Sequence, residues 1–115
     1  MEGMNVKKSQ LEVFDAVPFL FWAKDEDGRY IWGNRVINDF AGQDVTGKTD
    51  DELPWSDDAE ALRADDREVM RTGQPIFRHE HVDRSKTGQA TLSVCKFLGD
   101  LDGTRCVMGV SFVIE

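Results

Sequence analysis

The chain has 115 residues, of which 40% are hydrophobic and 31% are charged, and its formal net charge is −8. This length and composition are those of one folded domain with a single core. The negative charge argues against nucleic acid or an anionic membrane surface as a partner, because both would repel the chain. No apolar stretch approaches transmembrane length, and residues 1–10 lack the apolar region of a signal peptide, so we expect a cytoplasmic protein without a membrane-inserted segment.

The first predicted elements are a short helix and a β-hairpin. The helix is expected over residues 6–17 and ends before Pro18, because the residue before a proline avoids the helical conformation. Residues 19–24 and 29–34 are rich in the aromatic and β-branched side chains that are typical of strands. Asp25-Glu26-Asp27-Gly28 lies between them, and Asp-Gly tolerates the positive φ of a tight hairpin turn.

A polar, helix-biased stretch follows over residues 34–73. Asn34 is a good N-cap for a helix that ends at Gly42. Thr49-Asp50-Asp51-Glu52 fits a capping box that opens one short turn. The middle of the chain is therefore predicted to hold several short helical elements before its longest helix.

The longest helix is predicted over residues 57–72, with Ser56 as its cap and Gly73 at its end. Asp66 lies on the otherwise apolar face of this helix, between Leu62 and Val69. A carboxylate in such a place is either functional or held by a backbone N–H or a basic side chain. The sequence leaves both alternatives open.

Three more strands are predicted, over residues 75–82, 91–98 and 104–114. Asp100-Leu101-Asp102-Gly103 joins the last two as a second hairpin turn. Both faces of this hairpin are apolar, so one face covers the core and the other needs a second cover. That cover is expected to be either the N-terminal helix or another subunit.

The two cysteines lie on the last two predicted strands. Folding this hairpin about Leu101-Asp102 places Cys106 opposite Phe97, and Cys95 opposite Met108. The cysteines are then neighbours on the ladder but are not directly paired, which is a poor geometry for a disulfide. We expect two free, buried and inert thiols.

Four segments, in this order, resemble parts of a PAS domain: Asp15-Ala16-Val17-Pro18-Phe19, then residues 25–34, 66–75 and 102–112. The resemblance covers residues 11–114. It implies an α+β fold with an antiparallel five-stranded sheet, helices over one face, and the order ββαααβββ after a short N-terminal helix. Residues 1–18 are then an N-terminal cap and residues 19–115 the PAS-like domain. Either a ligand pocket or a filled core lies between the sheet and the helices.

The resemblance also implies a function. PAS domains usually act as sensory or dimerisation modules inside histidine kinases, diguanylate cyclases, chemoreceptors or transcription regulators. The expected partners are therefore a small-molecule ligand, and a second copy or adjacent domains of the same chain. The alternative is a structural dimerisation domain with a filled core and no ligand. Val113-Ile114-Glu115 stands where many signalling PAS domains have Asp-Ile-Thr, so the acid of that output motif is missing.

We expect no cofactor. The light-sensing flavin branch of the family needs a reactive cysteine in the helical middle, and the haem-binding branch usually takes an axial histidine from there. Residues 34–73 contain neither residue type. His79 and His81 share one side of a predicted strand, but no third metal ligand is evident. No Ser/His/Asp set or phosphate-binding glycine loop is present either, so no enzymatic activity is expected.

A ligand pocket, if present, is expected to be lined from both the sheet and the helices. Ser93, Cys95 and Ser111 are assigned to the inner face of the sheet, where the serine hydroxyls either bond a ligand or bond the backbone in a filled core. The apolar residues assigned to close the space are Phe40, Leu62 and Met70, with Trp32 beside it. Trp22, Trp32 and Trp55 either surround a ligand or pack in the core.

Overall fold

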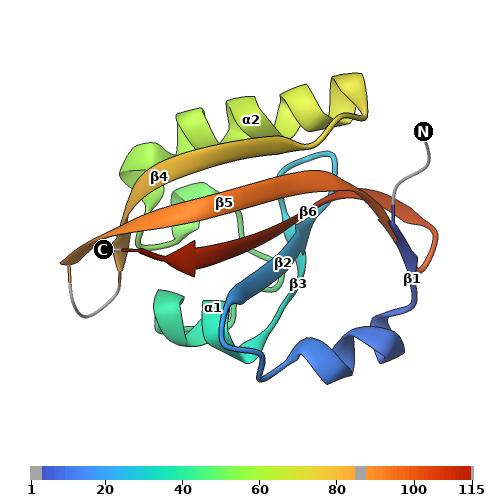
Figure 1. The fold of residues 1–115 in the computed structure, drawn as a ribbon, viewed down its shortest axis with the longest axis horizontal. Helices are drawn as coiled ribbons and strands as arrows, with labels where there is room; N and C mark the ends of the chain where they lie inside the picture. Colours follow the sequence, from blue (N-terminus) through green and yellow to red (C-terminus); the bar gives the residue numbers. More distant parts are fainter. Residues whose placement is uncertain (1–3, 85–87, 115) are drawn as a thin grey trace.

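The computed structural model describes residues 4–84 and 88–114. The chain first forms strand β1, the 3-10 helix η1 and the hairpin β2–β3, at Met4–Val6, Lys8–Phe14, Leu20–Lys24 and Tyr30–Gly33. The helical middle contains α1, the 3-10 turns η2 and η3, and α2, at Arg35–Ala41, Asp50–Glu52, Ser56–Asp58 and Ala59–Thr72. Strands β4, β5 and β6 follow, at Ile76–Arg84, Gly88–Leu101 and Thr104–Val113. Helix α2 lies along the sheet beside β4 (Figure 1).

The strands form one six-stranded sheet in the order β1-β5-β6-β2-β3, with β4 also paired to β5. Strands β4 and β1 share one edge of β5. β4 runs antiparallel along the first part of β5, and β1 runs parallel to its last residues, from Met4↔Gly99 to Val6↔Leu101. The predicted order of two strands, a helical middle and three strands is confirmed. The sheet differs from the prediction by a sixth strand, which is parallel.

The N-terminal segment differs from the helix expected over residues 6–17. Residues 4–6 are a strand, and the helix that follows is a 3-10 helix over Lys8–Phe14. The N–H of Asp102 donates a hydrogen bond to the carbonyl of Val6 at 3.0 Å, which adds to the pairing of β1 with β5. A strand of three residues is too short to show the alternation of apolar and polar residues that predicts a strand, and its partner lies at the other end of the chain. Residues 1–3 of the expected cap lie outside the described residues.

The turn of the last hairpin lies one residue later than expected. Asp102 and Gly103 have φ values of 50° and 87°, and Leu101 pairs with Thr104. A two-residue type I′ turn requires positive φ at both central residues, and Asp-Gly meets this requirement. The expected cysteine partners were therefore wrong, because Cys106 lies opposite Gly99 and Cys95 opposite Val110. Both thiols are free, and Cys106 is buried whereas Cys95 is only partly buried.

The helix ends follow the local chemistry of the sequence. The side chain of Asn34 accepts a hydrogen bond from the N–H of Ile37 and caps α1, and Gly42 ends this helix with a φ of 72°. The capping box at Thr49 is present, and Gly73 ends α2 with a φ of 71°. Helix α2 itself begins at Ala59, because the turn that Ser56 opens is the separate 3-10 turn η3.

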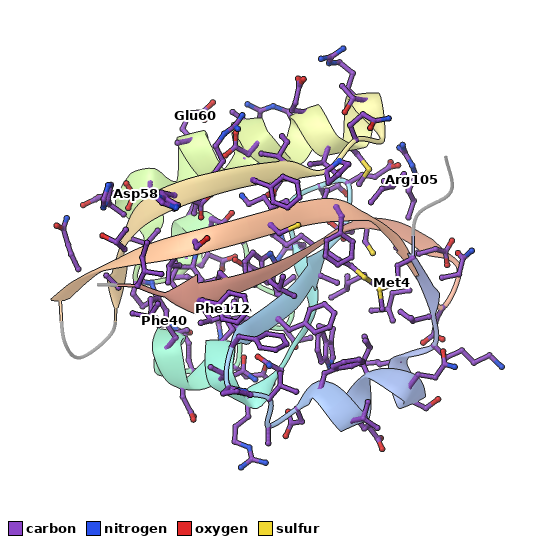
Figure 2. The ribbon with its side chains drawn as sticks, in the orientation of Figure 1. Met4, Phe40, Asp58, Glu60, Arg105 and Phe112 are labelled. Atoms are coloured by element: carbon purple, nitrogen blue, oxygen red, sulfur yellow. The ribbon has the colours of Figure 1, made fainter. Side chains whose placement is uncertain are left out.

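Apolar side chains pack on both faces of the sheet. On the inner face, residues of β2, β3, β4 and β5 pack against α1, the short turns and α2. On the outer face, η1 and β1 cover Phe21, Ala23 and Met108. The N-terminal segment thus covers part of the second apolar face, but Phe77 and Phe112 remain 69% and 49% exposed. Figure 2 labels Met4 at one end of the sheet and Phe112 toward the other end. Among the described residues, no helix is long and apolar enough to cross a membrane.

Candidate functional site

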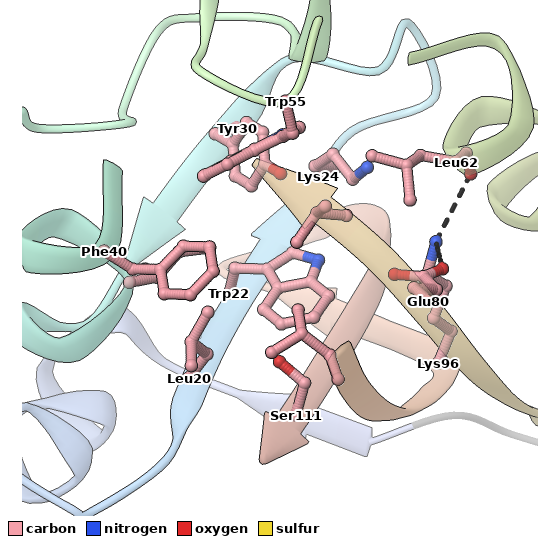
Figure 3. A pocket seen from close by; sticks show the side chains of 13 residues that line it. Leu20, Trp22, Lys24, Tyr30, Phe40, Trp55, Leu62, Glu80, Lys96 and Ser111 are labelled. Atoms are coloured by element: carbon pink, nitrogen blue, oxygen red, sulfur yellow. Dashed lines mark hydrogen bonds and ion pairs between the residues drawn. The ribbon is translucent and has the colours of Figure 1, made fainter. Parts of the chain in front are cut away.

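A small cavity lies between the inner face of the sheet and the helical middle. Its volume is about 30 Å³, which is room for about two water molecules. Most of its lining is aromatic or aliphatic, from Leu20, Trp22, Tyr30, Ile37, Phe40, Trp55, Leu62, Val82 and Leu92. Its polar lining residues are Lys24, Glu80, Lys96 and Ser111. Figure 3 shows Phe40 and Leu20 on one side of Trp22, and Glu80 and Lys96 on the other.

The alternation of side chains along the strands places these residues in the cavity. Successive residues of a strand point to opposite faces, so Leu20, Trp22 and Lys24 of β2 point inward while Phe21 and Ala23 point outward. Lys24 is the next residue after Leu20 and Trp22 on the inward-facing side of β2, so the alternation places its side chain in the interior. The same holds for Lys96 on β5, after Leu92. Each lysine is only 1% exposed.

Three carboxylates surround these two buried lysines. Lys24 Nζ lies 2.9 Å from Asp50 Oδ2 and 2.5 Å from Asp66 Oδ2. Lys96 Nζ lies 3.3 Å from Asp66 Oδ1 and 3.3 Å from Glu80 Oε2. Asp66 therefore bridges the two lysines, which is the second of the alternatives that the sequence left open for it. We call Lys24, Asp50, Asp66, Glu80 and Lys96 the charge cluster.

Asp50 is the most fully bonded member of the charge cluster. Besides Lys24, it accepts hydrogen bonds from the hydroxyl of Tyr30 and the indole N–H of Trp55, both at 2.8 Å. Burial alone would raise the pKa of Asp50, but the Lys24 ammonium and these hydrogen bonds hold it below its usual value. Burial would likewise lower the pKa of Lys24, but Asp66 and Asp50 raise it. Both groups are therefore charged inside the protein at neutral pH.

Glu80 and Tyr30 titrate differently from Asp50. Burial raises the pKa of Glu80, and the nearby Lys96 ammonium compensates only in part. Burial and the Asp50 carboxylate raise the pKa of Tyr30 well above its usual value, so its hydroxyl stays protonated and donates to Asp50. The hydroxyl of Tyr30 is therefore a fixed donor to Asp50 beside the cavity.

Two polar groups of the cavity lining have neither a hydrogen-bond partner nor an ion-pair partner among the described residues. They are the indole N–H of Trp22 and the hydroxyl of Ser111. Trp22 is 5% exposed and Ser111 is 0% exposed, so neither group reaches bulk water. Buried polar groups are usually hydrogen-bonded, so two free ones in one cavity require an explanation.

The structure brings together three of the seven predicted site residues. Phe40, Leu62 and Ser111 line the cavity. Met70 packs instead beside Val69 in a separate apolar cluster, and Trp32 lies on the outer face.

The prediction that Ser93 and Cys95 lie on the inner face of the sheet is wrong. Pairing across a two-residue turn places odd-numbered residues opposite even-numbered ones, so Ser111 shares a face with Val94. Ser93 and Cys95 lie opposite Phe112 and Val110 on the outer face.

The sequence reading missed most of the polar residues of the site. Lys24, Glu80 and Lys96 line the cavity. Lysine and glutamate are almost never buried without a partner, so the residue types alone predict exposed side chains at these positions. The alternation of side chains along the strands does indicate that the two lysines point inward. Lys24 follows Leu20 and Trp22 at every second residue, and Lys96 follows Leu92 and Val94 in the same way.

Comparison with known proteins identifies the family. A family model described as the PAS fold matches residues 14–115. The chain belongs to the PAS family. The expected α+β PAS fold is confirmed, with the sixth strand noted above. A search of curated protein sequences found no match to this PAS domain.

Several solved structures share the fold of this PAS domain. The VqmA–ligand–DNA complex of Vibrio cholera superposes with a TM-score of 0.81 at 18% identity, covering 91% of this chain and 50% of that chain. The PAS domain of an HTR-like protein from Haloarcula marismortui gives 0.73 at 20% identity, covering 92% and 90%. The PAS domain of the Cronobacter turicensis quorum-sensing receptor RpfR, in complex with BDSF, gives 0.71 at 17% identity, covering 86% and 96%. The chain spans about half the length of the VqmA chains that it matches.

Proposed function

We propose that this PAS domain is the sensory module of a larger signal-transduction protein, such as a histidine kinase or a diguanylate cyclase. It binds a small molecule in the inner cavity and has neither a cofactor nor an enzymatic activity of its own. The module is cytoplasmic, and its net charge of −8 supports the proposal that it does not itself contact nucleic acid.

The observation that carries this proposal is an inner cavity lined by aromatic side chains together with polar groups that lack a partner. Ligand sites in proteins combine a mostly apolar wall with a few placed polar groups. A core filled by its own side chains would be expected to pair its hydroxyl and indole N–H groups. The solved RpfR complex with BDSF and VqmA bound to DPO support the proposal, because both are structures of this fold with a small molecule bound.

The size of the cavity limits what binds without movement. A volume of about 30 Å³ does not accept a ring, so a larger ligand must displace a side chain. Phe40 is the best placed to move, because it lies on the short helix α1 and is only partly buried. We expect ligand binding to rotate Phe40 and to shift α1 relative to the sheet.

The proposal is tested on protein purified without refolding. Native mass spectrometry and an absorption spectrum detect a co-purified molecule, and a thermal-shift screen of small metabolites detects binding to the empty domain. Val82→Phe places extra volume in the cavity, and Val110→Phe places the same extra volume on the outer face. We expect the first variant to lose binding and the second to keep it. A wild-type domain with no co-purified molecule and no hit in the screen would refute the sensory proposal.

The exposed part of the outer face favours a second role, in dimerisation. Phe77 and Phe112 flank a hollow of about 500 Å³ that Cys95 and Val110 also line. Exposed aromatic side chains of this kind mark protein-interaction surfaces. We propose that a second copy of the domain covers this hollow. Sedimentation velocity should show a dimer for the wild type and a monomer for Phe112→Glu, and an unchanged sedimentation coefficient would contradict the proposal.

A further inference from the structure

Trp22 presents a fixed hydrogen-bond donor to the cavity. Its indole is held by Gly109, which lies directly opposite Trp22 on the neighbouring strand β6. A Cβ atom built on Gly109 would lie less than 3 Å from three atoms of the indole, so the ring occupies the space that a side chain at position 109 would fill. The position of the indole nitrogen is therefore set by the sheet rather than by a flexible side chain. Its N–H has no partner among the described residues.

Ser111 presents a second polar group to the same cavity. It lies opposite Leu20, two residues along β2 from Trp22, and therefore on the same face of the sheet. Its hydroxyl can donate one hydrogen bond and accept others, and it has no partner within the described part of the chain. A buried polar group whose hydrogen bond is unmade costs the protein stability. A ligand that completes these two groups recovers free energy that the empty domain lacks.

Both lysines of the cavity are already paired with carboxylates. Lys24 is held by Asp50 and Asp66 at 2.9 and 2.5 Å, and Lys96 lies between Asp66 and Glu80. The charge cluster thus has more carboxyl groups than ammonium groups. An anionic ligand would add a negative charge beside Asp66 and Glu80, and it would find no unpaired cation among the described residues that line the cavity. A cationic ligand would have to compete with two lysines for the same carboxylates.

We infer that the ligand of the inner cavity is a small uncharged molecule that accepts a hydrogen bond from the indole N–H of Trp22 and forms another with the hydroxyl of Ser111. The acceptor on the ligand, such as a carbonyl oxygen, receives the indole N–H. Once Phe40 has moved, the flat part of the ligand packs against the aromatic side chains that remain, which are Trp22, Tyr30 and Trp55. This inference rests on the proposed function and names the chemical class of its ligand.

Three probes of the same shape test the inference. Benzamide is uncharged and carries a carbonyl acceptor, benzoate is its anionic counterpart, and benzamidine is its cationic counterpart. Binding is measured by titration while the indole ¹H–¹⁵N signals are followed by nuclear magnetic resonance. We expect benzamide to bind at least tenfold more tightly than either charged probe and to shift the Trp22 indole signal. Equal or tighter binding of benzoate or benzamidine would overturn the inference.

Matched variants separate the hydrogen bond from packing. Trp22→Phe keeps a ring in the cavity but removes the N–H, and Trp32→Phe makes the same change on the outer face. We expect Trp22→Phe to reduce benzamide affinity about tenfold, which corresponds to one hydrogen bond, while toluene affinity changes little. Trp32→Phe should change neither. If Trp22→Phe does not fold, Ser111→Ala tests the hydrogen bond of the Ser111 hydroxyl in the same way. Ser93→Ala, which makes the same change on the outer face, is its control.

The outcome also distinguishes this inference from the proposed function. If native mass spectrometry finds a co-purified molecule that carries a net charge, the sensory function stands and the inference fails. The inference also fails if none of the three probes binds to a domain that does bind another small molecule. If neither a co-purified molecule nor any screened compound binds, both fail together.

Discussion

Replacing Asp50 by asparagine removes one charge from the most tightly bonded point of the interior. Oδ1 of Asp50 accepts from Tyr30 and Trp55, and Oδ2 accepts from Lys24. An asparagine has one oxygen and one NH₂ group at these two positions. Either orientation of the amide therefore points its NH₂ group at another donor. The side chain keeps its size, so the effect comes from charge and hydrogen bonding rather than from a cavity.

The expected loss is large for a domain of this size. Removing one partner of a buried ion pair costs about 3–5 kcal/mol, because the other charge is left uncompensated. Lys24 would retain Asp66 at 2.5 Å, so we expect a value near the lower end of this range. With an m-value of about 2 kcal/mol/M, a loss of about 3 kcal/mol lowers the urea midpoint by about 1.5 M. Domains of this kind have only about 5–15 kcal/mol of total stability.

Urea unfolding, followed by tryptophan fluorescence, measures this loss. Asp51→Asn is the matched control, because it makes the same chemical change one residue later, where the side chain is 59% exposed and pairs with Arg63 at the surface. We expect the control to change the free energy of unfolding by no more than about 1 kcal/mol. Equal losses for the two variants would refute the argument, since they would show that the buried carboxylate is worth no more than an exposed one.

The pH dependence gives a second check on Asp50. Its pKa is lowered in the folded state, so its contribution is fully present above the usual value of 3.8 and is lost as the pH falls through the folded-state pKa. The stability difference between wild type and Asp50→Asn should therefore be constant near neutral pH and should narrow below pH 3.8. A double variant with Lys24→Met should lose less than the sum of the two single losses, because the two side chains contact each other.

Three other properties of the domain are predicted from the same structure. Asn34→Ala should lower the free energy of unfolding by about 2 kcal/mol or more in a urea titration, because its side chain caps α1 and bonds three further backbone groups. Glu80→Gln should become more stable relative to wild type as the pH rises from 4.5 to 7, because the folded-state pKa of Glu80 is raised and the wild type loses stability on ionisation; an opposite trend in urea titrations would contradict this. Burial raises the pKa of Cys106 to about 11, so mass spectrometry after brief alkylation of the native domain should find the label on the partly exposed Cys95 first.

Local chemistry was sufficient to predict the helical middle of the fold. The cap at Asn34, the capping box at Thr49 and the glycines that end α1 and α2 each act within a few residues of chain. Such features are visible in a sequence because both partners lie close together in it. The order of strands and helices followed from these ends and from the two Asp-Gly turns.

Features that depend on distant residues were not predictable in the same way. Strand β1 exists only because β5 offers it an edge. The charge cluster combines residues from β2, η2, α2, β4 and β5, and no short segment of sequence shows that these elements meet. The error at Ser93 has a different cause. The strand was correct, and only the rule for pairing across a two-residue turn was needed to place Ser93 on the outer face.

The charge cluster also restricts how the chain can assemble. Each of five elements contributes one charged side chain to it, and a shift of one residue in a strand moves every side chain of that strand to the other face. A one-residue shift of β5 would carry Lys96 into the apolar outer face, leave Asp66 with Lys24 alone, and remove the Lys96 ion pair of Glu80. A misaligned sheet would thus bury unpaired charges, which an apolar interior tolerates poorly. The cluster therefore selects one register of β2, β4 and β5 against α2, where an apolar interior alone would accept several.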